Sequence, residues 1–140
     1  MAARITNTQA QDLTGAPRRV LIVDEDGRDL QYYGSLLEQL GYEVRRCDSF
    51  GSGARSLDGE PFDFVVVSQG GRAFEGRKLL ERVLSVDRHI PVLVLTRSVE
   101  MGCYLEAMQL GAVDYLEKPL GQAEMARVVQ THLRSRVAAA

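Results

Sequence analysis

The chain has few cysteines, no long apolar run and almost no net charge, and each absence excludes a class of protein. Its two cysteines, Cys47 and Cys103, form no metal-ligand cluster, so we expect small core residues in a reducing, cytoplasmic setting. No apolar run approaches a membrane span, and the N-terminus has no apolar signal core. The formal charge of -2 predicts neither nucleic acid nor an anionic membrane as a partner.

The length of 140 residues predicts one domain that buries a core without disulfides or a structural metal. Residues 1–17 are polar, lack an apolar pattern and contain Gly15 and Pro17. We therefore expect a disordered leader there. The folded domain is then expected over residues 18–136, with a short tail at residues 137–140.

Short apolar runs alternate with segments of helical periodicity. The run at residues 64–67 is rich in valine and lacks the in-out alternation of a strand with one wet face, so a strand covered on both faces is predicted there. Strands are expected over residues 20–23, 42–47, 62–68, 92–95 and 113–116. Helices are expected over residues 28–40, 50–57, 78–86, 99–110 and 121–136.

Five strands alternating with five helices predict an α/β fold with a doubly wound parallel sheet. The arginines Arg45 and Arg46 indicate that the second strand lies at an edge of the sheet. The carboxyl ends of the other four strands should share one edge, where ligands gather in such folds. The polar residues expected to meet there are Asp24, Glu25, Ser68, Thr96 and Lys118.

These strand ends and their flanking sequences resemble a response-regulator receiver domain. The residues that carry the resemblance are VLIVDED at 20–26, Gly41–Tyr42, FDFVVV at 62–67, PVLVLT at 91–96, GAVDYL at 111–116 and Lys118–Pro119. Together they cover nearly all of residues 18–136. The resemblance implies a flavodoxin-like sheet with strand order 2-1-3-4-5.

The resemblance also implies roles for the strand-end residues. In the family, an aspartate after the third strand accepts a phosphoryl group from a histidine kinase, and an acidic pair holds Mg²⁺ beside it. The acidic pair maps to Asp24 and Glu25, the hydroxyl that follows the phosphate to Thr96, and the phosphate-pairing lysine to Lys118, which precedes Pro119. The acceptor position maps to Ser68.

A serine at the acceptor position is neutral, shorter than a carboxylate and weakly nucleophilic without a base, which excludes aspartyl phosphorylation there. The following loop also departs from the family, because Arg72 replaces a proline and Glu75–Gly76 replaces an Asp-Gly pair. We therefore expect an atypical, non-enzymatic receiver that has left the phosphorelay. It should need no cofactor.

Mg²⁺ should bind only weakly, through Asp24, Glu25 and the carbonyl near Gly70, because one of three carboxylates is missing. Lys118 is then expected to form an ion pair with Asp24 or Glu25. Tyr115 corresponds to an aromatic that reports the phosphorylation state in the family. Here it is expected to be either fixed in one rotamer or moved by a partner, and the simpler alternative is a half-buried strand residue without a switching role.

The helix expected at residues 99–110 has two apolar stripes. Val99, Cys103, Ala107 and Leu110 are expected to pack on the sheet. The opposite stripe has no obvious core to enter and is expected, with Tyr115, to bind a protein partner or a second copy; its members are Met101, Tyr104, Leu105 and Met108. This surface lies where the family uses the fourth helix, fifth strand and fifth helix for dimerisation and output contacts.

Two alternatives remain. One is a conventional phosphorelay receiver with a displaced acceptor at Asp24, Glu25 or Asp63, of which Asp63 is expected to lie far from Lys118. The other is a flavodoxin-like binder or hydrolase of a small ligand, which is disfavoured because the strand-end acids would repel phosphate and no nucleophile and base form a pair.

Overall fold

The computed structural model describes residues 10–12 and 14–139, and gives the backbone path alone for residues 134–139. Predictions for residues 1–9, 13 and 140 lie outside this range.

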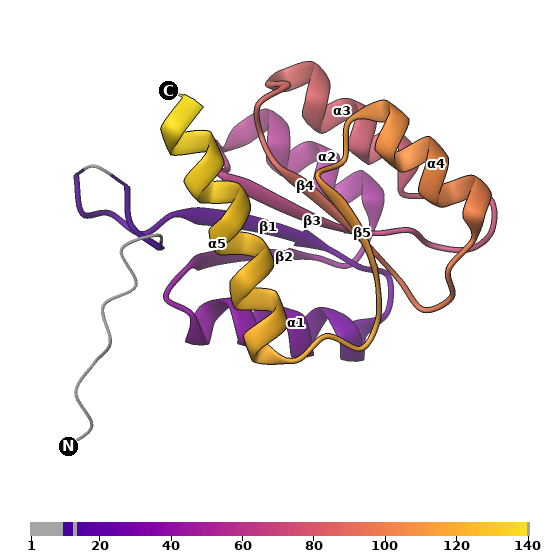
Figure 1. Cartoon of the computed structure of the whole chain (residues 1–140), viewed down its shortest axis with the longest axis horizontal. Coiled ribbons are helices and arrows are strands. Elements are labelled where there is room, and N and C mark those ends of the chain that lie inside the picture. Colours follow the sequence, from indigo (N-terminus) through magenta and orange to yellow (C-terminus); the bar gives the residue numbers. More distant parts are fainter. Residues whose placement is uncertain (1–9, 13, 140) are drawn as a thin grey trace.

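Five parallel strands form one sheet in the order β2-β1-β3-β4-β5, which confirms the predicted fold (Figure 1). The strands are β1 (Arg19–Val23), β2 (Glu43–Cys47), β3 (Phe64–Ser68), β4 (Val92–Thr96) and β5 (Asp114–Glu117). Every residue of β3 and β4 is buried, as their unbroken apolar runs predict. The exposed arginine Arg45 lies on β2, which forms one edge of the sheet.

Five helices cover the two faces of the sheet. They are α1 (Gly27–Gln39), α2 (Phe50–Gly59), α3 (Arg77–Val86), α4 (Met101–Leu110) and α5 (Gln122–Ala139). Helices α1 and α5 lie on one face, whereas α2, α3 and α4 lie on the other (Figure 1).

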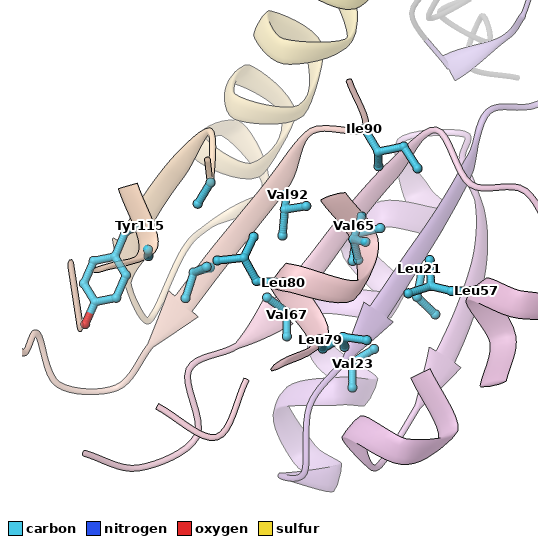
Figure 2. Packing of buried hydrophobic residues seen from close by; sticks show 14 of the residues in the cluster. Leu21, Val23, Leu57, Val65, Val67, Leu79, Leu80, Ile90, Val92 and Tyr115 are labelled. Carbon is cyan, nitrogen blue, oxygen red and sulfur yellow. The ribbon is translucent and has the colours of Figure 1, made fainter. Parts of the chain in front are cut away.

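Successive side chains of a strand point to opposite faces, so each central strand contributes to two cores. Leu21 and Val65 pack with Leu57 and Leu80 beneath α2 and α3 (Figure 2). The second core lies beneath α1 and α5 and includes Ile22, Phe64, Leu37, Met125 and Val129. The strand ends are therefore supported by a packed core on each face of the sheet.

Residues 10–12 and 14–17 correct the prediction of a disordered leader up to residue 17. Ala10 is 3% exposed within the core beneath α1, and its carbonyl accepts a hydrogen bond of 2.5 Å from the Arg18 N–H. Asp12 accepts hydrogen bonds from the N–H groups of Thr14 and Ala16. Local side-chain hydrogen bonds of this kind close a turn without any apolar periodicity, so the absence of an apolar pattern does not imply disorder here.

Helix α5 corrects the prediction of a tail at residues 137–140, because it continues to Ala139. Alanine has the highest intrinsic helix propensity, so the last alanines extend the helix rather than end it. Helix α4 ends at the expected glycine, Gly111, whose φ of 116° lies in the left-handed region that favours glycine.

Both cysteines are buried and free, as predicted for core residues. Within the described part of the chain, none of the helices combines the length and the apolar character needed to cross a membrane.

Candidate functional site

The strand ends of β1, β3, β4 and β5 surround a cavity of about 450 Å³. Its lining contains all five predicted strand-end residues: Asp24, Glu25, Ser68, Thr96 and Lys118. The parallel sheet brings them together because each lies at the carboxyl end of its strand or directly after it. Gly70 also lines the cavity, so every predicted pocket residue apart from Tyr115 and Pro119 lies on its wall.

Lys118 is bound by two carboxylates inside the cavity. Its Nζ lies 2.7 Å from Oδ2 of Asp24 and 2.8 Å from Oδ2 of Asp29, and the lysine side chain is only 7% exposed. Burial by itself lowers the pKa of Lys118, but the hydrogen bonds that its ammonium group donates to Asp24 and Asp29 outweigh burial and leave the pKa raised. The predicted pair with Asp24 is present, whereas the other partner is Asp29 of α1 instead of Glu25, which is exposed.

Arg97 also forms ion pairs with acids beside the cavity. It follows β4, and its guanidinium contacts Oδ2 of Asp26 and, at 3.2 Å, Oδ2 of Asp29. Asp26 also caps α1, because its Oδ1 accepts the N–H groups of Arg28 and Asp29. The Asp29 N–H lowers the pKa of Asp26, and the charge of Arg97 lowers it further.

Ser68 ends β3 and is 9% exposed. Its Oγ accepts a hydrogen bond of 3.3 Å from the Gly70 N–H, so the hydroxyl is bound within its own loop. Gly76 closes this loop against the Ser68 carbonyl, because a Cβ on Gly76 would lie 2.2 Å from that oxygen. The Glu75 carboxylate accepts the Gly71 N–H at 2.6 Å. Glu75, which departs from the family pattern, thus stabilises this loop.

Thr96 is 3% exposed and also bonds locally. Its hydroxyl donates to the Ser98 carbonyl at 2.8 Å and accepts the Ser98 N–H at 3.2 Å. Pro119 lies outside the cavity lining and follows Lys118 through a cis peptide bond.

Tyr115 of β5 is 6% exposed and therefore more deeply buried than the alternative of a half-buried strand residue implies. Figure 2 shows the ring at the border of the hydrophobic cluster. Its hydroxyl donates to Oε1 of Gln69 and accepts the Glu100 N–H at 3.2 Å. The Gln69 amide in turn donates to the Gly71 carbonyl at 3.1 Å. Gln69 therefore joins β5 to the loop that follows β3.

Comparison with known proteins decides the family. Residues 20–130 match the model of the response regulator receiver domain. The chain belongs to this family. It is a response regulator receiver domain in two-component signalling.

Relatives are found in bacteria and plants. Response regulator PleD of Caulobacter vibrioides is 30% identical over 128 residues, which are 89% of this chain and 28% of PleD. Two-component response regulator ARR11 of Arabidopsis thaliana is 32% identical over 123 residues, 85% of this chain and 23% of ARR11. Transcriptional regulatory protein FixJ of Bradyrhizobium diazoefficiens is 28% identical over 115 residues, 82% of this chain. The chain spans 56% of FixJ, and a smaller share of the other two.

Solved structures agree on the fold. The crystal structure of a CheY-like receiver domain protein from Methanospirillum hungatei has a TM-score of 0.82 and 24% identity, and the match covers 88% of this chain and 98% of that one. A receiver domain from Clostridium thermocellum gives a TM-score of 0.79 at 23% identity, over 88% of this chain and 99% of that one.

The acids of this receiver domain do not fit the Mg²⁺ ion that the family implies. Asp24 accepts the Asp26 N–H at one oxygen and Lys118 at the other, and Ser68 supplies only a neutral hydroxyl. Among residues 10–12 and 14–139, Asp, Glu, His and Cys side chains form no group of three or more that could hold a metal ion. Mg²⁺ requires near-octahedral oxygen ligands and gives up water reluctantly, so this donor set is a poor one.

Helix α4 of the receiver domain presents an apolar surface to solvent. We call Met101, Tyr104, Leu105 and Met108 the α4 patch; these side chains are between 36% and 65% exposed. Cys103 and Ala107 are buried on the opposite side, as predicted. Val99 is 49% exposed, so its predicted packing on the sheet is wrong. The helix begins only at Met101, and helical spacing does not apply to a residue before it.

Tyr115 is not part of that solvent surface, although the sequence placed it there. Its buried ring lies beneath Tyr104, with the ring centroids 5.6 Å apart in an edge-to-face arrangement. The α4 patch is therefore connected to the cavity through Tyr104, Tyr115 and Gln69. Sequence reasoning missed Asp29, Arg97 and Gln69. The run of acids at residues 24–26 indicated a nearby cation, but nothing in the sequence identified Arg97 as that cation.

Proposed function

We propose that this receiver domain acts in signal transduction without phosphorylation at the end of β3, and that it transmits its signal by binding another protein through the α4 patch. The observation that carries the proposal is the pairing of Lys118 with Asp24 and Asp29, beside a serine in place of an acceptor carboxylate. The lysine that would balance a phosphoryl group is already neutralised by the chain itself.

Within the described part of the chain, no side-chain base is hydrogen-bonded to the Ser68 hydroxyl. Its Oγ accepts a hydrogen bond from the Gly70 N–H, and the neighbouring Lys118 is protonated and bound by carboxylates. A hydroxyl needs an adjacent base or a metal to become a good nucleophile. We therefore assign no enzymatic activity to the site.

The α4 patch supports the second half of the proposal. Exposing several methionine and leucine side chains on one helix to water is unfavourable, and such apolar patches are typical of binding surfaces. The neighbouring ion pairs, Arg72 with Glu100 and Arg77 with Glu106, supply the polar border that such surfaces commonly have. Tyr104 of the patch packs on Tyr115, which corresponds to the switch aromatic of the family.

Intact-protein mass after incubation with acetyl phosphate and Mg²⁺ tests the first half. The native chain is expected to stay unmodified. A Ser68→Asp variant, which supplies an acceptor carboxylate next to Lys118, is expected to gain the mass of one phosphoryl group. A phosphoryl mass on the native chain would contradict the proposal, and peptide mapping would then distinguish a displaced acceptor at Asp24 or Glu25.

Charge substitution in the α4 patch tests the second half. Leu105→Glu should abolish protein binding, whereas Val86→Glu on α3, an equally exposed apolar position, should not. Sedimentation velocity over a range of concentrations is the first measurement, because a second copy of the chain is the simplest partner. Association that weakens only in Leu105→Glu supports the patch, whereas association that survives this substitution refutes it. If the native chain stays monomeric, the partner is a different protein. A two-hybrid screen with Leu105→Glu as its control would then identify that protein.

A further inference from the structure

Three aspartates at the start of α1 lie close enough to repel one another. We call Asp24, Asp26 and Asp29 the acidic cluster; they are joined through Lys118 and Arg97, each of which contacts two of them. Unpaired like charges at such short range destabilise a fold, and a partly buried set requires opposite charge nearby. In the family, a divalent cation supplies positive charge at this edge of the sheet, held by the acidic pair that corresponds to Asp24 and Glu25.

Arg97 supplies charge on the outer side of the cluster. Its Nε and Nη2 lie 3.3 Å and 3.2 Å from the same Oδ2 of Asp29, and its Nη2 also contacts Oδ2 of Asp26. A guanidinium carries several fixed N–H donors and stays protonated at any ordinary pH, so it can bind two carboxylates at once. One side chain thus contacts two acids of the cluster, Asp26 and Asp29.

Lys118 supplies charge on the inner side. It shares Oδ2 of Asp29 with Arg97, and it takes the remaining oxygen of Asp24. The two cations therefore meet at one carboxylate oxygen. A metal ion would have to displace both of them to bind Asp29 and Asp24 together.

We propose that Arg97 and Lys118 are built-in counter-ions of the acidic cluster, which take the place of the divalent cation and make the folded domain independent of it. The inference concerns cation binding, and it stands or falls separately from the phosphorylation state of Ser68. Arg97 is the part that can be removed cleanly, because its side chain is 64% exposed and packs into neither core.

Thermal unfolding with and without millimolar Mg²⁺, at matched ionic strength, tests this inference. The variants are Arg97→Ala and Arg97→Gln. The control is Arg72→Ala, because Arg72 lines the same cavity but pairs with Glu100 outside the acidic cluster. Circular dichroism establishes that each variant is folded, and line broadening of amide resonances by Mn²⁺ shows where an ion binds.

The native chain and Arg72→Ala should show no saturable response to Mg²⁺. The two Arg97 variants should become more stable, with the melting temperature rising by roughly 5 °C when Mg²⁺ is about tenfold above its dissociation constant. Mn²⁺ should then broaden residues 24–29 in these variants alone. A saturable rise in the native chain would overturn the inference, because the ion would bind despite Arg97. Arg97 variants that ignore Mg²⁺ would overturn it too, since Arg97 would not then occupy the place of an ion.

Discussion

The hydroxyl of Tyr115 donates a hydrogen bond to the side-chain oxygen of Gln69, and both residues are buried. Gln69 directly follows Ser68, whereas Tyr115 lies beneath the α4 patch. The bond therefore connects the altered end of β3 with the proposed binding surface and requires no phosphoryl group. It also gives the Tyr115 hydroxyl a structural role at a position where the family uses an aromatic residue as a switch.

The bond between Tyr115 and Gln69 should be measurable as a coupling energy. Tyr115→Phe removes the donor and leaves a buried amide oxygen unpaired, at an expected cost of about 1–3 kcal/mol. Combined with Gln69→Met, the loss should be smaller than the sum of the two single losses by about 1 kcal/mol. Urea unfolding of the four proteins measures it, and Tyr104→Phe serves as a control on an exposed ring. Losses that simply add would show that the two residues are not coupled.

Removing only one partner of the ion pair between Lys118 and Asp24 should strongly destabilise the domain. Lys118→Met leaves Asp24 buried without its cation, and the expected loss of stability is about 3–5 kcal/mol. The double variant Asp24→Asn with Lys118→Met should recover part of that loss, because no unpaired charge remains on Asp24. Arg82→Met, which breaks the exposed pair with Asp58, should cost less than about 1 kcal/mol. Equal effects of Lys118→Met and Arg82→Met in chemical denaturation would contradict this account.

Gly76 should tolerate no side chain. A Cβ at this position would meet the Ser68 carbonyl oxygen, so Gly76→Ala should destabilise the domain by about 1–3 kcal/mol. Gly102 of α4 has open space around it, and Gly102→Ala should stabilise the domain by about 0.5–1 kcal/mol through helix propensity. Denaturant midpoints measure both. A harmless Gly76→Ala would mean that the loop moves freely away from Ser68.

Stability in acid should depend on Asp26. The Asp29 N–H and the Arg97 charge lower its pKa in the folded chain, so the unfolded chain binds more protons as the pH falls. The stability due to Asp26 is therefore present above about pH 4 and lost as the pH falls through the folded pKa. Asp26→Asn keeps a good helix cap but carries no charge. The variant should be less stable at neutral pH and lose stability less steeply below about pH 4, as pH-dependent urea unfolding would show; parallel acid limbs in the two proteins would exclude this role.

The sequence by itself determined the sheet and the polar residues at the ends of its strands. The unbroken apolar runs of β3 and β4 are compatible only with burial on both faces, and parallel strands must place Asp24, Ser68, Thr96 and Lys118 at one edge. Local patterns were sufficient here. Unbroken apolar runs indicate which strands are buried, and the alternation of strands with helices indicates that the strands are parallel.

Only the tertiary structure decided which side chains meet within that edge. Lys118 and Asp29 are 89 positions apart, Arg97 and Asp29 are 68 apart, and Tyr115 and Gln69 are 46 apart. Each contact depends on how far a helix start or a loop reaches over the strand ends, which apolar periodicity does not encode. The same limit explains Val99, where two residues of difference in the start of α4 moved a side chain from the expected core into solvent.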